Sequence, residues 1–363
     1  MNEKPKIKVL VVDDSALARR VITDALERDP EITVVGNANN GKTAIFKSFT
    51  LDPDVITMDI EMPIMNGLEA LREIIRVNPK PVIMMSVLTQ YGAEVTFKAL
   101  EYGAVDFVPK PSSVLAMSPE ELSAQLVAKV KAVAKSVIRI RPSRFDVEKA
   151  VSSDSKDSFR YEAPSKMESL SKDGKSGKLV GIGASTGGPS ALMKVFTSFP
   201  DNFPAPVLVV QHMPEGFTKA FAERLNSSSS LEVKEAEDMD KVLPGCGYIA
   251  PGHSHILLEK KSGEYLIRLS KSEKVSGHRP SIDVMLSSIA ENYTSELIGV
   301  IMTGMGRDGA EGMSKIRQKG GYTVAQDEET SVVYGMNRVA VELGGVVDKV
   351  PLEEISKKIV EHL

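Results

Sequence analysis

Polar side chains stand at the ends of four successive apolar runs in the first third of the chain. These end residues are Asp13 and Asp14, then Asp59, then Ser86 and finally Lys110. If the runs are parallel strands of one sheet, their carboxyl ends lie at the same edge and the side chains converge. Carboxylate oxygens suit Mg²⁺, and a carboxylate can also accept a phosphoryl group as a nucleophile. The spacing therefore predicts a site for a magnesium ion and a phosphoryl group.

Each of these residues has an expected role. Three carboxylates held close together repel one another, so their assembly indicates a bound cation. Asp13, Asp14 and Asp59 are the expected metal ligands, and Asp59 is also the expected acceptor of the phosphoryl group. Lys110 would neutralise charge on the phosphoryl oxygens. Ser86 would hydrogen-bond one of those oxygens and so report that the site is occupied.

A second set of residues points to acyl chemistry. Ser185 lies in a G-x-S-x-G segment after an apolar run, an arrangement that exposes a serine hydroxyl above a sheet. His212 follows the next run and can take the serine proton, and Asp308 follows a third run and can orient the imidazole. The chain order Ser, His, Asp differs from the Ser, Asp, His order of α/β-hydrolases.

Other interpretations of these residues are open at the level of the residues alone. The glycine-rich run 181–188 could bind a nucleotide, although its spacing is not G-x-G-x-x-G and no acidic residue ends the next strand. His253 and His255 share a strand face and could bind a metal, but a third ligand is not obvious. Asp283 is a rival carboxylate for the histidine, although we prefer it as a helix N-cap, and Asp308 could cap the helix that follows it.

The elements that must position these residues alternate as short apolar strands and amphipathic helices. In residues 1–140 this alternation predicts a flavodoxin-like α/β fold with a five-stranded parallel sheet. Ser15 is the expected cap of a helix that ends at Arg28. Its predicted apolar stripe is Leu17, Val21, Ile22, Ala25 and Leu26. The strands are expected at Lys8 to Val12, Ile32 to Val35, Val55 to Met58, Val82 to Met85 and Val105 to Val108.

The rest of the chain divides into a linker and a second α/β domain. Residues 141–178 are rich in Ser, Lys, Asp and Gly and carry few apolar side chains, which is typical of a linker. Residues 179–363 resume the alternation and predict a doubly wound, mostly parallel domain. Within it, the segment 232–270 has shorter alternating stretches that favour added antiparallel strands.

Composition excludes several classes of protein. The 363 residues carry a net charge of -4 and no basic stripe, so nucleic acid is not an expected partner. The single cysteine, Cys246, excludes an internal disulfide and fits a reducing compartment. No apolar run approaches the ~20 residues that a membrane span needs, so we expect a cytoplasmic protein without membrane insertion.

The segment before the linker resembles the response-regulator receiver domain. The resemblance rests on the acidic pair, the Met-Asp-Ile-Glu-Met-Pro segment around Asp59, Asn66-Gly67, Ser86 and Lys110-Pro111. It implies phosphorylation of Asp59 by a sensor histidine kinase with Mg²⁺. Phe107 stands where the family often has an aromatic that repacks on activation, although a core role explains it equally well.

The segment after the linker resembles the catalytic domain of the chemotaxis protein-glutamate methylesterases (CheB). The motifs are Gly-Ala-Ser-Thr-Gly-Gly, Gln-His-Met-Pro, Ile-Ala-Pro-Gly, His-Arg-Pro-Ser and Met-Thr-Gly-Met-Gly-x-Asp-Gly. The resemblance implies Ser185 as nucleophile, His212 as general base and acid, and Asp308 as its orienting group. It also implies that Thr186 and the backbone N–H of Met305 lie at the oxyanion and substrate site.

The combined resemblance implies a phosphorylation-activated carboxylic-ester hydrolase. Its expected substrates are glutamate γ-methyl esters on the cytoplasmic helices of chemoreceptors, with deamidation of receptor glutamines as a second reaction, and hydrolysis itself needs no cofactor. Without phosphate, the receiver is expected to cover the cleft that holds Ser185. Two rivals are a receiver joined to a non-hydrolytic nucleotide-binding domain and an adaptor with an inactive triad.

Overall fold

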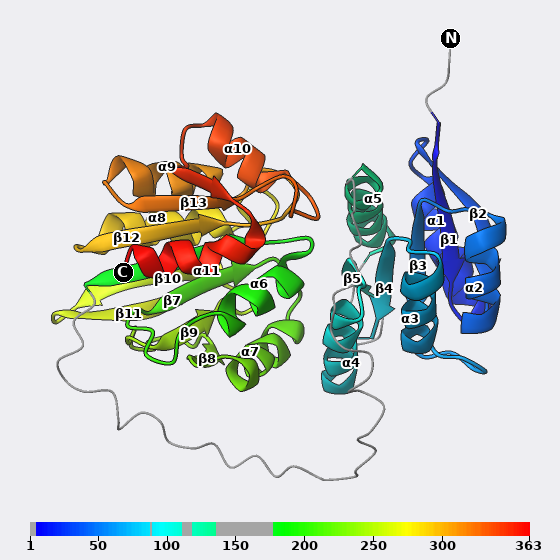
Figure 1. Ribbon diagram of the computed structural model, residues 1–363, viewed down its shortest axis with the longest axis horizontal. Coiled ribbons are helices and arrows are strands. Elements are labelled where there is room, and N and C mark those ends of the chain that lie inside the picture. Colours follow the sequence, from blue (N-terminus) through cyan, green and yellow to red (C-terminus); the bar gives the residue numbers. More distant parts are fainter. Residues whose placement is uncertain (1–4, 88, 111–117, 136–176) are drawn as a thin grey trace, which may run out of the picture.

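The chain forms two α/β units, each built on its own parallel sheet (Figure 1). The computed structural model describes residues 5–87, 89–110, 118–135 and 177–363. Most of the predicted linker, 141–178, lies outside the described residues.

The first unit has the predicted five-stranded sheet, in the order β2-β1-β3-β4-β5 with every neighbouring pair parallel. This order places the carboxyl ends of β1 and β3 side by side, where the acidic residues were expected to meet. The strands are β1 (Ile7–Val12), β2 (Ile32–Ala38), β3 (Val55–Asp59), β4 (Val82–Ser86) and β5 (Asp106–Pro109). The helices are α1 (Ala16–Glu27), α2 (Gly41–Thr50), α3 (Gly67–Val77), α4 (Gln90–Glu101) and α5 (Pro119–Lys135).

Helix α1 confirms the predicted cap but corrects the predicted stripe. The Ser15 hydroxyl accepts a hydrogen bond from the backbone N–H of Ala18, as an N-cap should. Ile22, Ala25 and Leu26 are buried, whereas Leu17 is 72% exposed and Val21 37% exposed. The two exposed residues belong to the first half of the helix, so only its second half packs on the core.

The second unit is a seven-stranded sheet in the order β14-β13-β12-β6-β7-β9-β8. Its strands are β6 (Lys178–Ala184), β7 (Val207–Gln211), β8 (Glu232–Glu235), β9 (Cys246–Ile249), β12 (Glu296–Ile301), β13 (Tyr322–Gln326) and β14 (Asp348–Val350). Its helices are α6 (Gly188–Thr197), α7 (Phe217–Ser228), α8 (Ile282–Asn292), α9 (Ala310–Gln318), α10 (Met336–Glu342) and α11 (Leu352–Glu361). The adjacent strands β12, β6 and β7 carry the loops that contain the candidate catalytic residues.

The segment 232–270 was predicted to add antiparallel strands, and this is correct only for its second half. Strands β10 (His255–Lys261) and β11 (Glu264–Ser270) form an antiparallel hairpin. Strands β8 and β9 instead pair in parallel and extend the main sheet beside β7. Parallel pairing was missed because these two strands have only four residues each and show little periodicity.

The two units meet through an aromatic cluster. Phe97 of α4 and Phe107 of β5 pack against Phe217 and Phe221 of α7. The rings of Phe107 and Phe217 lie closest, with centroids 4.6 Å apart, and all four side chains are at most 3% exposed. An ion pair between Arg224 and Glu101 borders the cluster. These contacts bring α4 and β5 against the face of the second unit that carries α6 and α7 (Figure 1).

None of the helices in the described ranges combines the length and apolar character needed to cross a bilayer.

Candidate active site

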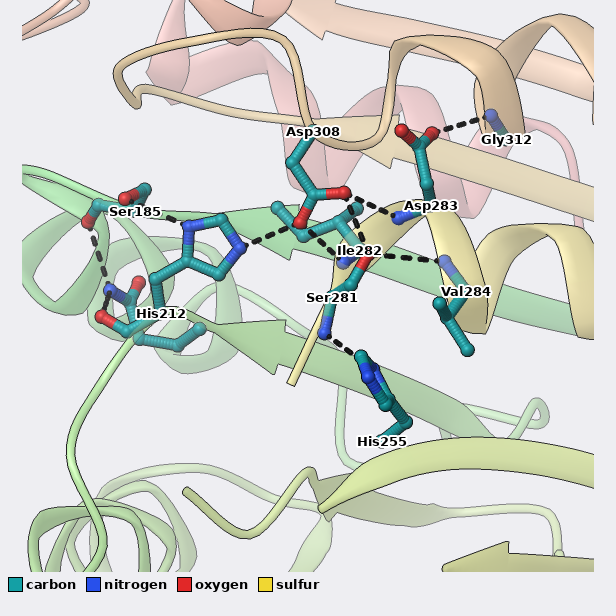
Figure 2. A network of polar contacts seen from close by, with 10 residues as sticks. Ser185, His212, His255, Ser281, Ile282, Asp283, Val284, Asp308 and Gly312 are labelled. Carbon is teal, nitrogen blue, oxygen red and sulfur yellow. Dashed lines mark hydrogen bonds and ion pairs between the residues drawn. The ribbon is translucent and has the colours of Figure 1, made fainter. Parts of the chain in front are cut away.

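The three predicted catalytic residues meet at the carboxyl edge of the second sheet (Figure 2). Ser185 follows β6, His212 follows β7, and Asp308 lies in the loop between β12 and α9. His212 Nδ1 is 3.1 Å from Ser185 Oγ, and His212 Nε2 is 2.8 Å from Asp308 Oδ2. Because β12, β6 and β7 are neighbours in a parallel sheet, their loops bring these groups together without long excursions of the chain.

The hydrogen bonds define the tautomer of the imidazole. Burial alone would raise the pKa of Asp308, but hydrogen bonds from His212 and from backbone amides outweigh it and lower the pKa to about 2. An ionised Asp308 can only accept hydrogen bonds, so His212 Nε2 must be protonated and must donate a hydrogen bond to this carboxylate. The unprotonated Nδ1 is then free to accept the proton of Ser185.

Asp308 is bound to the amino end of helix α8 rather than to the helix that follows it in sequence. Its carboxylate accepts hydrogen bonds from the backbone N–H groups of Ile282 (2.8 Å) and Asp283 (3.0 Å). The Ser281 hydroxyl donates a further hydrogen bond, of 2.7 Å, to Asp308 Oδ1. Helix α9 begins instead after Gly309, which has no side chain to cap it. The alternative that Asp308 caps α9 is therefore wrong.

Asp283 is neither the partner of His212 nor an N-cap. Ser281 caps α8, and Asp283 lies in the first turn with one carboxylate oxygen accepting from the N–H of Gly312, 2.8 Å away. Burial raises the pKa of Asp283. The preferred assignment of this residue as the cap was wrong by two positions, because Ser281 and Asp283 are both good capping residues.

The backbone around Ser185 is held by buried polar side chains. Gln211, 2% exposed, donates from Nε2 to the carbonyl oxygens of Ser185 (2.9 Å) and His212 (3.1 Å). The Ser185 N–H donates to the Thr303 carbonyl at 3.0 Å, and the Thr303 hydroxyl donates to the Thr186 carbonyl at 2.9 Å. The three catalytic loops are thus tied together through their main chains as well as through the triad.

Thr186 and Met305 are the residues expected at the oxyanion site. Thr186 directly follows Ser185 in the chain, and Met305 lies in the loop between β12 and α9. Thr186 is 4% exposed and Met305 is 38% exposed. A side chain at Gly304 would place its Cβ 2.7 Å from Ser185 Cβ, so the 304–305 segment passes directly beside the serine. Gly187 adopts a φ of +76°, and a Cβ there would meet Val332 at 2.6 Å. Both glycines permit the close approach of loops that the site requires.

One residue at the site was not predicted from the sequence. The ring of His278 stacks on His212 with centroids 3.8 Å apart and planes 7° apart. Burial and the neighbouring His212 lower the pKa of His278 to about 4, so it is neutral at neutral pH. The His-Arg-Pro-Ser motif had been noted, but nothing in a linear sequence indicates that its histidine stacks on one 66 residues earlier.

The alternative metal site at His253 and His255 gains no support. The His253 Nδ1 lies 2.7 Å from the Ser254 hydroxyl. His255 is fully buried, and both of its ring nitrogens are used in hydrogen bonds to the main chain. In the described part of the chain, the acidic cluster of the first unit is the one group of three or more potential ligands that the geometry brings together.

That cluster is formed by Asp13, Asp14 and Asp59, whose ligand oxygens all lie within 4.8 Å of one another. Lys110 Nζ is 2.6 Å from Asp13 and 2.7 Å from Asp59. Burial raises the pKa of Asp59, and the opposing effect of the neighbouring Lys110 does not cancel this rise. The same burial would lower the pKa of Lys110, but its two carboxylate partners outweigh it and raise the pKa. The donor set consists of carboxylate oxygens, which fits a hard divalent cation such as Mg²⁺.

Ser86 and Phe107 lie in β4 and β5, the two strands that follow β3 in the sheet order. Ser86 is fully buried, and its hydroxyl is 2.6 Å from the Thr96 hydroxyl of α4. Phe107, in the neighbouring strand, belongs to the aromatic cluster that joins the two units. Ser86 thus connects β4, the strand beside β3 and Asp59, to α4, and Phe107 connects β5 to the second unit.

Comparison with known proteins gives two family matches. Residues 180–359 match the CheB methylesterase family, and residues 9–119 match the response regulator receiver domain. The protein-glutamate methylesterase/protein-glutamine glutaminase of Pyrococcus horikoshii is 46% identical over 98% of this chain and 93% of its own length. That of Methanococcus maripaludis is 43% identical over 98% and 99%. The crystal structure of the Thermotoga maritima CheB methylesterase catalytic domain matches with a TM-score of 0.51 and 48% identity, covering 52% of this chain and 100% of that one.

Proposed function

Since this chain belongs to the protein-glutamate methylesterase/protein-glutamine glutaminase family, we propose that it hydrolyses glutamate γ-methyl esters on chemoreceptors. The observation that carries the proposal is the hydrogen-bonded series Ser185–His212–Asp308 at the carboxyl edge of the second sheet. The proposal places the enzyme in the cytoplasm, because the helical part of a chemoreceptor that bears the esters lies there.

The first half of the reaction forms an acyl-enzyme. Ser185 Oγ attacks the ester carbonyl carbon while His212 Nδ1 takes the hydroxyl proton. The ionised Asp308 stabilises the resulting imidazolium through Nε2. Collapse of the tetrahedral intermediate breaks the carbon–oxygen bond to the methoxy group, which leaves as methanol with the proton from His212.

The second half releases the product. Water attacks the acyl carbon, His212 takes a proton from it and returns that proton to Ser185 Oγ, and glutamate is formed. A glutamine side chain would follow the same course with ammonia as the leaving group. Both reactions therefore use the same three residues and need no resident cofactor.

The developing oxyanion needs donors other than the serine N–H. The N–H of Ser185 is already bonded to the Thr303 carbonyl. We assign the oxyanion and substrate site to Thr186, which follows the serine in the chain, and to the backbone N–H of Met305, in the segment that passes beside the serine. Helix α6 begins at Gly188, and its positive end adds to the stabilisation of negative charge here.

The receiver unit supplies the regulation. Asp59 would accept a phosphoryl group from a sensor histidine kinase. Asp13, Asp14 and Asp59 would hold Mg²⁺, whose charge would help to neutralise the phosphoryl oxygens. Lys110 already contacts Asp13 and Asp59 and would move to pair with the phosphoryl group. Ser86 would turn its hydroxyl from Thr96 to a phosphoryl oxygen.

Loss of the hydrogen bond between Ser86 and Thr96 would remove a contact that holds α4 against β4, so α4 would shift on phosphorylation. Phe97 lies on the same helix as Thr96 and packs against Phe217 and Phe221 of the catalytic unit. A shift of α4 would therefore loosen the face between the units and open the approach to Ser185. In the state without phosphate, the receiver restricts that approach.

The test is methanol release from methylated receptor membranes by the wild type and by Ser185→Ala. We expect release by the wild type and a loss of at least ~10³-fold in the variant, because the nucleophile is removed. Equal release by the two proteins would overturn the triad assignment. Measurable ATP or NAD binding without any release would favour the rival nucleotide-binding function.

A further inference from the structure

The His278–Ser281 segment contacts the triad at both of its ends. His278 stacks on His212, as described above, and the Ser281 hydroxyl donates a 2.7 Å hydrogen bond to Asp308 Oδ1. Ser281 is completely buried and is also the N-cap of α8. A hydroxyl in this position replaces the water that a carboxylate loses on burial.

Behind Ser281 lies a second buried histidine. The N–H of Ser281 donates to His255 Nδ1 at 3.1 Å (Figure 2). His255 Nε2 donates to the Glu273 carbonyl at 3.0 Å. The first contact requires an unprotonated Nδ1 and the second a protonated Nε2. His255 is therefore neutral and held in a single tautomer, and it joins the β10 strand to the start of α8.

We propose that Ser281 and His255 are positioning residues that fix the Asp308 carboxylate for catalysis. His255 fixes the main chain of Ser281, Ser281 fixes Asp308, and Asp308 fixes His212. This inference rests on the proposed function, since it assigns the residues that hold the proposed triad in place.

The hydrogen-bond count at Asp308 explains why one hydroxyl matters. Oδ2 accepts from His212 Nε2 and from the Ile282 N–H, while Oδ1 accepts from Ser281 Oγ and from the Asp283 N–H. Loss of the hydroxyl would leave Oδ1 with a single donor. The carboxylate would then rotate more freely and bind protons more tightly. The imidazole that it contacts would also bind protons more tightly.

Other charged groups near Asp308 and His212 influence proton binding equally in the wild type and in a Ser281 variant. His278 faces His212 from the preceding loop, and Asp283 faces Asp308 from α8. Glu311 of α9 acts on Asp283. Lys274, in the segment between β11 and α8, and Lys129, in helix α5 of the receiver, act on His278. Since a substitution at Ser281 leaves these groups in place, a change in the pH profile reports the lost hydroxyl.

The first test compares Ser281→Ala with Ser281→Thr in the full-length protein, using methanol release from methylated receptor membranes across pH 5 to 9. We expect Ser281→Ala to lower kcat about tenfold. We also expect the acid limb of the kcat/KM profile, where activity falls as the pH is lowered, to move to higher pH by about one unit. Ser281→Thr keeps the hydroxyl and should retain most of the activity and the wild-type acid limb. A merely structural role would lower activity without moving that limb.

The second test uses two amides at position 255. In His255→Asn the side-chain oxygen can take the place of Nδ1 and accept from Ser281, whereas in His255→Gln the amide nitrogen takes the place of Nε2. We expect His255→Asn to keep the wild-type acid limb and His255→Gln to shift it upward as Ser281→Ala does.

The outcomes separate this inference from the proposed function. An active wild type whose acid limb is unchanged in Ser281→Ala and His255→Gln would overturn the positioning role alone. A wild type that releases no methanol would overturn the proposed function and this inference with it.

Discussion

At the scale of single residues, the Asp308 carboxylate accepts four of the hydrogen bonds that hold the candidate site together. This carboxylate links the imidazole of His212 to the amino end of α8. A neutral amide in its place could still accept at one atom. It could not stabilise an imidazolium, and its NH₂ group could hold His212 in the tautomer that cannot accept from serine.

We therefore predict that Asp308→Asn lowers kcat by on the order of 10³-fold to 10⁴-fold, as loss of the tautomer-fixing acid does in serine hydrolases. KM should change much less, because the residue does not contact the ester. The measurement is steady-state methanol release, with far-ultraviolet circular dichroism to establish folding. A folded variant within tenfold of wild-type activity would contradict the role of Asp308.

His278 provides a prediction about stability. Its pKa is lowered to about 4 in the folded protein, so the unfolded chain binds more protons than the folded one between pH 4 and 6.5. The contribution of neutral His278 to the free energy of unfolding is thus fully present above pH 6.5 and is lost as the pH falls to about 4. A shift of this size is worth up to about 3 kcal/mol.

His278→Phe keeps a stacked ring but removes the titration. We predict that urea unfolding of the variant loses less free energy between pH 7 and pH 4 than unfolding of the wild type, by up to about 3 kcal/mol. Asp59 and Asp283, whose pKa values are raised, titrate in both proteins and cancel in the comparison. Identical pH dependence in the two proteins would show that His278 is not held neutral by the fold.

At the scale of elements, helix α4 joins the phosphoryl site to the catalytic unit. Thr96 of this helix contacts Ser86, and Phe97 inserts among the rings of Phe107, Phe217 and Phe221. Aromatic pairs contribute about 0.5–1.5 kcal/mol beyond the area that they bury. Loss of one ring therefore changes the equilibrium between docked and released units by several-fold.

We predict that Phe97→Leu raises the basal activity of the unphosphorylated protein by about three- to tenfold, since each 1.4 kcal/mol is a factor of ten. The ratio of phosphorylated to unphosphorylated activity should fall accordingly. Phe203→Leu is the matched control, because Phe203 is equally buried but packs on Phe199 inside the catalytic unit. A rise of the same size in both variants would indicate general loosening rather than release of the receiver.

The elements also explain which features of the site could be predicted from the sequence. A parallel α/β pattern places every residue that follows a strand at one edge. The G-x-S-x-G segment and the positions of Ser185 and His212 after strands therefore sufficed to predict that the two side chains meet. The attachment of Asp308 to α8 could not, because α8 begins 26 residues before it and no local periodicity relates the two. Leu17 was misplaced for a similar reason, since a helical stripe does not indicate where the core ends.

At the scale of the whole molecule, the arrangement of the two units could not be predicted. Phe97 and Phe217 are separated by 120 residues, and both satisfy the pattern of an ordinary core position. A contact between them depends on the shapes of two complete surfaces. The occlusion of Ser185 by the receiver was accordingly an expectation from resemblance and stays a prediction until activity is measured.

Removal of residues 1–140 tests that prediction directly. The truncated protein loses α4 and β5, so the aromatic face of α7 is uncovered and, if the receiver restricts access, the approach to Ser185 opens. We predict that its basal release of methanol exceeds that of the unphosphorylated full-length protein several-fold and no longer responds to a phosphoryl donor. Full-length Asp59→Asn, which keeps the receiver but cannot be phosphorylated, should stay at the low basal rate. Activity that falls or stays level after truncation, in a protein that remains folded, would mean that the receiver does not restrict access to the catalytic site.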